Sequence, residues 1–290
     1  LGRGRHPQAR VGGILHTVSD EPSIELAADE ARSAEHVSAV IADLEQELEA
    51  VKPHGWSAKF DMSASLGPTP MNARGVMAGR GKMLVTKMDM KVGPQQVRRV
   101  MVVDEDGVSW MEAGVLGQVQ VRKMDLRSLG AKSEDAAYAA MLFEQASGAP
   151  LGLGQPPLDM LEGFERNYTL TVTGAETMDD AKVYVLEGRV KEGSLSTPES
   201  PADVSTTPFA AVRLWVDAKT GFGRRVAAAD TTGKAVLSFT FSDVDMNASL
   251  GPDTFDYTPP QGAVVQDVTE SVRKEMERRQ PQQPAKAQQQ

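Results

Sequence analysis

Few side chains in this sequence have the types and spacing that catalysis requires. All four histidines (His6, His16, His36 and His54) precede the first expected strand, so no imidazole is available on a sheet as a base or metal ligand. The chain has no Gly-x-Ser-x-Gly or His-Glu-x-x-His motif. The nearest approach to a phosphate-binding loop, GVMAGRGKM over 75–83, has the wrong spacing and Met where Ser or Thr is needed. These observations favour binding over catalysis.

Clustered carboxylates are the remaining candidates for metal or acid–base chemistry. Asp104, Glu105 and Asp106 adjoin Gly107 between two expected strands. Asp-Gly is the ordinary sequence of a tight hairpin turn, so we interpret this cluster as a turn in preference to a calcium site. A hydrolase that uses such carboxylates is kept as an alternative function.

Composition excludes several classes of protein. The 290 residues carry 31 Lys and Arg against 40 Asp and Glu, a net charge of −9, so the basic excess that nucleic-acid backbones require is missing. The absence of cysteine excludes disulfides, thiolate nucleophiles and Cys-based zinc sites. Since the sequence begins at Leu1, a cleaved signal peptide is one expectation for what preceded it.

The apolar residues include many methionines. Hydrophobic residues make up 40% of the chain and aromatic ones only 5%, whereas there are 14 Met. Flexible thioethers suit a surface that must fit ligands of varying shape, although they also fill irregular cores. Met83 shares its strand parity with Val85, and Met88 with Met90, which fits an apolar face lining either a core or a cavity. Eight of the methionines fall between residues 71 and 124: Met71, Met77, Met83, Met88, Met90, Met101, Met111 and Met124.

The hydrophobic periodicity predicts helices at a few places and strands over most of the chain. Apolar residues three and four apart predict a helix over 24–51, which Pro53 ends. A Ser N-cap and an acidic first turn predict a second helix over 133–147. Period-2 alternation predicts about ten or eleven antiparallel strands, at about 56–65, 72–91, 95–103, 108–112, 117–124, 168–173, 181–191, 209–217, 222–230 and 234–246.

The last strands resemble a known family. The closing element FDYTPPQGAVV over 255–265, preceded by LWVD over 214–217, is similar to the end of LolA-like periplasmic lipoprotein carriers. DGVSW over 106–110 is similar to a hairpin of the same family. The resemblance covers roughly residues 30–268, most specifically over the last 55 or so.

This resemblance implies a mainly β fold, an unclosed, curved antiparallel half-barrel capped by α-helices. It divides the chain into a flexible arm (1–23), the half-barrel with its lid helices (24–268) and a charged, Gln-rich tail (269–290). The family's carriers have an Arg-Pro after the Gly-x-Leu strand, and that Arg is implicated in latching the lid. Here the corresponding stretch, residues 84–90, has no Arg-Pro, and Lys87 is the nearest cation.

The function that the resemblance implies is non-catalytic binding and transport of lipid or lipoprotein acyl chains in the periplasm. It implies no cofactor or metal, a monomer, and inner- and outer-membrane lipoprotein-sorting proteins as partners. A sensor or protein-interaction domain of the cell envelope, which shuttles no lipid, is the alternative. The expected wall of the cavity is Met83, Val85, Met88, Met90, Met101, Val103, Trp110 and Met111. The expected lid residues are Met141, Leu142 and Phe143.

Overall fold

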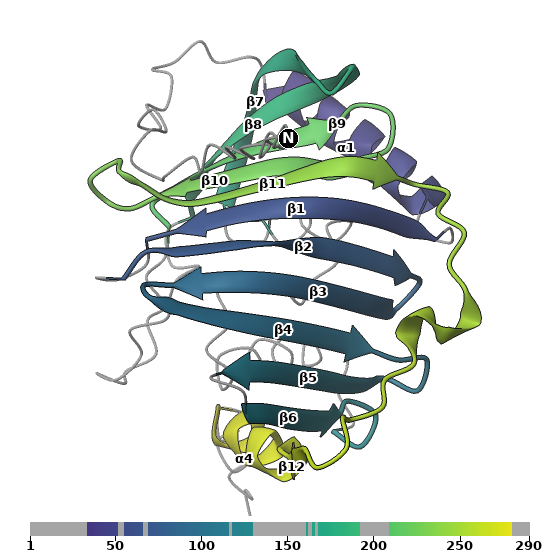
Figure 1. Ribbon diagram of the computed structural model, residues 1–290. Coiled ribbons are helices and arrows are strands. Elements are labelled where there is room, and N and C mark those ends of the chain that lie inside the picture. The colour runs from purple at the N-terminus through teal and green to yellow at the C-terminus, as the bar shows by residue number, and fades with distance from the viewer. Residues whose placement is uncertain are drawn as a thin grey trace, which may run out of the picture.

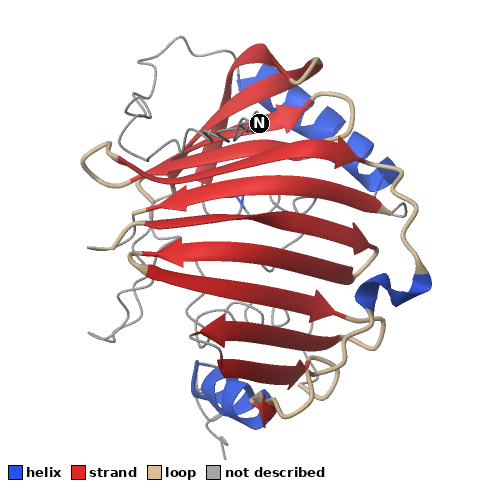
Figure 2. Cartoon of the chain, in the orientation of Figure 1, coloured by secondary structure: helices blue, strands red, loops and turns tan. Residues whose placement is uncertain are grey.

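The structure is a computed structural model that describes residues 34–51, 55–65, 69–115, 118–129, 161, 164–165, 168–191 and 209–279. The arm, the helix expected over 133–147 and the far end of the tail lie outside these ranges. Figures 1 and 2 show the described elements as one sheet with helices beside it.

Strands make up most of the described chain. The helical elements are α1 (Ala34–Val51), the 3₁₀ turn η3 (Pro252–Phe255) and α4 (Thr269–Arg279). The strands are β1 (Trp56–Ala64), β2 (Met71–Arg80), β3 (Met83–Val92), β4 (Gln95–Val103), β5 (Val108–Val115), β6 (Gln118–Asp125), β7 (Tyr168–Met178), β8 (Ala181–Val190), β9 (Ala211–Asp217), β10 (Gly223–Ala229), β11 (Ala235–Asp245) and β12 (Val264–Asp267).

The strands form one open sheet in the order β12-β6-β5-β4-β3-β2-β1-β11-β10-β9-β8-β7. Two antiparallel meanders, β1–β6 and β7–β11, meet where β1 pairs with β11. The sheet curves without closing, and its two outer strands lie at opposite ends (Figure 1). The expected class, an unclosed and mainly antiparallel β half-barrel with helices, is confirmed.

The structure differs from the expected strands in two places. The strand region expected over 72–91 is a hairpin, β2 and β3, because Gly81 adopts a φ of +58° in the turn between them. The closing element forms a twelfth strand, β12, which pairs with β6 in parallel. Four residues are too short a run for period-2 alternation to mark a strand.

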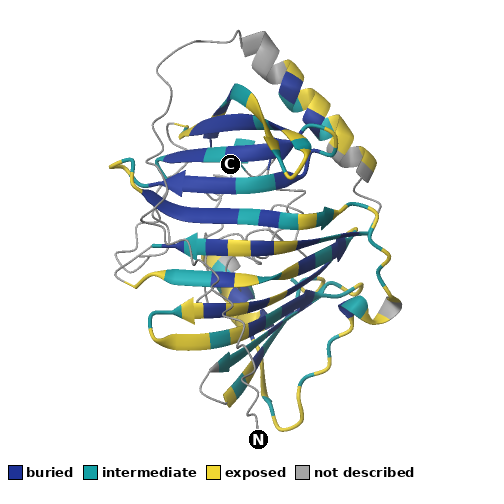
Figure 3. Ribbon diagram, turned by 45° about the horizontal axis from the view of Figure 1, so that its top comes forward, coloured by how far each residue is buried: buried dark blue, intermediate teal, exposed yellow. Residues whose placement is uncertain are grey.

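Alternating residues place one side of each strand in the core. On β1 the odd-numbered Ser57, Lys59 and Asp61 are more exposed than the even-numbered Ala58 and Phe60. Strands β9 and β10 differ, because nearly every residue in them is buried. Figure 3 shows this contrast between the largely buried β8–β11 end of the sheet and the alternating strands at the other end. Both sheet faces are therefore covered near β8–β10.

Candidate functional site

The two faces of the sheet carry different clusters of apolar side chains. We call one the helix face, because Val40 and Leu44 of α1 and Val272 of α4 belong to its core cluster. We call the opposite one the strap face, because the strap, residues 246–263 between β11 and β12, packs Phe255 and Tyr257 against it. Figure 1 shows the strap running from the end of β11 past the ends of the next strands to β12.

Methionines line the helix face from β1 to β6, and each of these strands contributes at least one. In the antiparallel register Met101 of β4 lies opposite Met111 of β5, and Met90 of β3 lies opposite Ala73 of β2. Paired residues share a face, so these thioethers form rows across neighbouring strands. The buried methionines of this cluster are Met62, Met77, Met88, Met90, Met101, Met111 and Met124. This part of the face is apolar and adaptable in shape.

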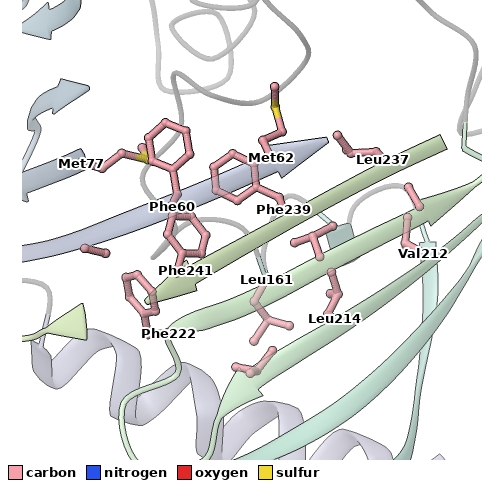
Figure 4. Close-up of a cluster of buried hydrophobic side chains, with 14 of the residues drawn as sticks. Phe60, Met62, Met77, Leu161, Val212, Leu214, Phe222, Leu237, Phe239 and Phe241 are labelled. Atoms are coloured by element: carbon pink, nitrogen blue, oxygen red, sulfur yellow. The ribbon is translucent and has the colours of Figure 1, made fainter. Parts of the chain in front are cut away.

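Aromatic rings line the helix face where the two meanders join. Phe60 of β1 stacks on Phe239 of β11 with centroids 5.0 Å apart, and Phe239 lies 4.6 Å from Phe241. Phe222 meets Phe241 edge to face at 5.3 Å. Figure 4 shows these rings together, with Met62 and Met77 beside them. Rings with few rotamers make this half of the face stiffer than the methionine half.

Two glycines of β2 let the helix face pack closely. A Cβ on Gly75 would lie 2.2 Å from the Lys87 carbonyl oxygen and 2.9 Å from the Met88 Cα. A Cβ on Gly79 would lie 2.6 Å from the Trp56 indole nitrogen. A single strand over 72–91, as expected from the sequence, would have used Gly75, Gly79 and Gly81 as bends. In the structure Gly75 and Gly79 make room for neighbours on β3 and β1, and Gly81 makes the turn.

Polar side chains are also buried on the methionine half of the helix face. Thr86 is completely buried, and its Oγ1 has no hydrogen-bond partner within the described ranges. Arg99 is 5% exposed. In the register Thr86 lies opposite Met77 and Met101, and Arg99 lies opposite Met88. A hydroxyl and a guanidinium are thus buried among thioethers.

The strap face carries a second, smaller cluster around Trp110. The Tyr257 ring lies 5.5 Å from that of Trp110, and its hydroxyl donates a 2.8 Å hydrogen bond to Glu112 Oε2. Burial, and then this bond to a carboxylate, raise the pKa of Tyr257 above its ordinary value. Lys123 Nζ lies 5.4 Å from the centre of the Trp110 ring. The two Tyr257 contacts hold the strap to β5, and Lys123 of β6 packs on the same Trp110 ring.

The structure divides the eight expected wall residues between the two faces. Five belong to the helix-face cluster: Met88, Met90, Met101, Val103 and Met111. Met83, Val85 and Trp110 belong instead to the strap-face cluster, with Phe255 and Tyr257. The expected lid residues Met141, Leu142 and Phe143 lie outside the described residues.

The expected wall did not include Met62, Met77, Met124, Thr86 or Arg99, although Met77 and Met124 belong to the methionine-rich stretch of 71–124. The parity of β2 and β3 could have been set by reading Gly81 and Lys82 as a two-residue turn, which puts Met77 on the face of Met88. Burial of Thr86 and Arg99 leaves no signal in the sequence, because both are common on exposed strand positions.

The carboxylates Asp104, Glu105 and Asp106 form the turn between β4 and β5, as interpreted from the sequence. Asp104 Oδ1 accepts a 2.9 Å hydrogen bond from the Val108 amide, and Gly107 has a φ of +73°. Throughout the described ranges, no three His, Asp or Glu side chains come together as metal ligands. Of the helices in these ranges, none is long and apolar enough to cross a membrane.

Comparison with known proteins finds likenesses among solved structures. No family model matches the chain, and no curated protein matches it. An uncharacterized conserved protein from Thermus thermophilus shares 12% identity at a TM-score of 0.44, over 79% of this chain and 99% of that one. Lipoprotein LppX from Mycobacterium tuberculosis shares 16% identity at a TM-score of 0.40, over 74% of this chain and 98% of that one. A chain of the Pseudomonas aeruginosa MucA/MucB complex shares 14% identity at a TM-score of 0.34, over 76% of this chain and 61% of that one. These TM-scores are low, so the fold assignment rests on the strand order and registers above.

Proposed function

We propose that the methionine half of the helix face binds the acyl chains of a lipid or lipoprotein, without catalysis, in a bacterial cell envelope. The observation that carries this proposal is the set of seven buried methionines, which occupy one face of six adjacent strands. An ordinary core of this size does not need thioethers in every strand. A surface that must fit acyl chains of different length and unsaturation gains from them.

The energetics of such a surface suit a carrier. Each acyl methylene that leaves water for an apolar surface contributes about 0.8 kcal/mol, so a long chain is bound firmly. A flexible wall adapts to the chain without a large penalty for overpacking. The transport step, the periplasmic location and the lipoprotein-sorting partners at either membrane are part of the proposal and follow from the sequence resemblance.

The proposal is tested first on the purified full chain. Extraction in denaturing solvent followed by mass spectrometry should recover lipid reproducibly, and a fluorescent fatty acid should bind the delipidated protein. A chain that carries no lipid and also rejects the fatty acid would contradict the proposal.

A matched pair of variants then locates the binding surface. Met88→Gln places an amide on the helix face and should weaken fatty-acid binding about tenfold or more, because the bound chain would leave that amide without water. Met83→Gln makes the same change on the same strand but on the strap face, and should leave the affinity within about twofold. Equal effects of the two variants would argue against the helix face as the site.

One observation favours the second candidate function, an envelope sensor or protein-interaction domain that shuttles no lipid. Lys87 is the cation closest in sequence to the place where the carriers have their latching Arg, and it is exposed. Its strand parity puts it on the strap face, because the neighbouring Met88 lies on the helix face. Lys87 is therefore badly placed to hold anything on the helix face. A chain that neither carries nor accepts lipid would support this second function.

A further inference from the structure

Two buried polar side chains interrupt the methionine half of the helix face. Thr86 is 0% exposed and Arg99 5% exposed, and both lie on central strands, β3 and β4. Thr86 Oγ1 has no hydrogen-bond partner in the part of the chain that the structure describes. A buried hydroxyl without a partner and a buried guanidinium both reduce stability relative to apolar residues of similar size. Packing alone therefore gives no reason for the Thr86 hydroxyl.

The register places these side chains close together. Thr86 lies directly opposite Met101, and Arg99 lies directly opposite Met88, two residues away along each strand. Diagonal neighbours of this kind on one sheet face have Cβ atoms about 7–8 Å apart, within reach of a long side chain. The residues that separate and flank them are Met77, Met88 and Met101, all buried.

The chemistry of the pair suits an anion. A guanidinium presents planar N–H donors that match a carboxylate or a phosphate, and a threonine hydroxyl can donate one more bond. Arg99 also makes contacts within the protein. A guanidinium has five N–H donors, so it can make those contacts and bind a head group as well. A head group bound here would have its acyl chain against the neighbouring thioethers.

We propose that Thr86 and Arg99 bind the anionic head group, a carboxylate or a phosphate, of an acidic lipid whose acyl chain lies against Met77, Met88 and Met101. This inference rests on the proposed function and narrows its ligand from acyl chains in general to acidic amphiphiles. It makes Arg99 and Thr86 the residues that determine specificity, while the methionines supply most of the affinity.

The test compares three probes that share one oleyl or oleoyl chain: oleate, oleoyl lysophosphatidic acid and uncharged oleyl alcohol. The purified full chain is delipidated and each probe is titrated against a bound fluorescent fatty acid. Arg99→Gln should weaken one or both acidic probes about tenfold or more, because a charge-assisted bond is lost, and leave oleyl alcohol within about twofold. The acidic probe that loses more affinity identifies carboxylate or phosphate as the preferred head group.

Two further variants guard against a folding defect in Arg99→Gln. Arg98→Gln makes the same charge change on the adjacent residue, which is exposed on the other face, and should leave all three affinities unchanged. Thr86→Val keeps the shape of the side chain and removes the hydroxyl. It should weaken the favoured acidic probe about threefold or more without lowering the melting temperature.

The outcomes separate this inference from the proposed function. If all three probes bind the native chain equally and Thr86→Val changes none of them, the head-group site is refuted while acyl binding stands. If no probe binds the native chain, the proposed function itself fails. A loss of oleyl alcohol binding in Arg99→Gln as large as that of the acidic probes also refutes the head-group site.

Discussion

At the scale of single residues, Gly75 shows how closely the methionine half is packed. Gly75→Ala should destabilise the protein by about 1–3 kcal/mol or more. The reason is that the new Cβ would meet the backbone of β3 at 2.2 Å, at the Lys87 carbonyl oxygen. Gly174→Ala is the matched control, because nothing lies within 4 Å of its Cβ position. Urea unfolding of the two variants measures the difference, and equal stabilities would show that β2 and β3 are not in this register.

The buried hydroxyl of Tyr168 should make the stability of the protein depend on pH in the alkaline range. It donates a 3.1 Å hydrogen bond to the Phe209 carbonyl, and burial raises the pKa of Tyr168 to about 12. A raised pKa means that the stability from this group is complete below the unfolded-state value of about 10 and is lost as pH rises through about 12.

The stability advantage of the native chain over Tyr168→Phe should therefore be constant up to about pH 10 and shrink from there to about pH 12. Urea unfolding at a series of pH values measures it, and the absorbance of tyrosinate reports the ionisation directly. An advantage that stays constant up to the highest pH would mean that Tyr168 is not buried as described.

At the scale of elements, α4 is tied to the sheet by its first residues. Asp267 Oδ1 accepts a 3.0 Å hydrogen bond from the Thr269 amide, and Thr269 Oγ1 accepts one of 3.0 Å from the Asp125 amide on β6. The Thr269 hydroxyl first, and then its amide, lower the pKa of Asp267. The Val272 side chain, one turn into α4, packs in the helix-face core. The stretch expected as tail thus begins as part of the folded sheet edge.

Removing this cap should cost a measurable amount of stability. Asp267→Ala should lower the free energy of unfolding by about 1 kcal/mol at neutral pH, the usual value for a lost side-chain hydrogen bond to a backbone N–H at the start of a helix. Since the folded-state pKa of Asp267 is depressed, the contribution of its charge is present above the ordinary carboxyl pKa of about 3.9 and is lost as pH falls below it. Denaturant unfolding at neutral and acid pH tests both statements.

Asp256→Ala is the control for this cap, since it removes an exposed carboxylate from the neighbouring strap. It should be close to neutral. A loss as large as that of Asp267→Ala would point to net charge, and not capping, as the cause.

Elements differ in how well the sequence predicts them. Regular alternation, as in Tyr168 to Thr173, marks a strand because only an extended backbone puts every second residue on one face. The hairpin at Gly81 was missed, because three glycines close together look like bends in one strand. The parallel pairing of β12 depends on contacts with β6, far away in the chain, which no local pattern reports.

At the scale of the whole molecule, the sequence predicted a methionine-rich apolar surface, but not which residues share one face of the sheet. Five of the eight expected wall residues share the helix face, and three lie on the strap face. The split arises because the expected set mixed odd and even positions within strands, such as Val85 with Met88 on β3. Side-chain parity within a strand is a local property, whereas the relative parity of two strands depends on the turn that joins them.

The pairing of β1 with β11 has a consequence for how the chain folds. Each meander is built from neighbouring hairpins, so β1–β6 and β7–β11 can form from contacts that are close in sequence. The junction between them brings Phe60 together with Phe241, and β12 later returns to β6. Both of these pairings close long loops and need the last part of the chain. We therefore expect the aromatic junction to form late, so that until synthesis is nearly complete β1 and β6 are unprotected strand edges on which a chaperone could act.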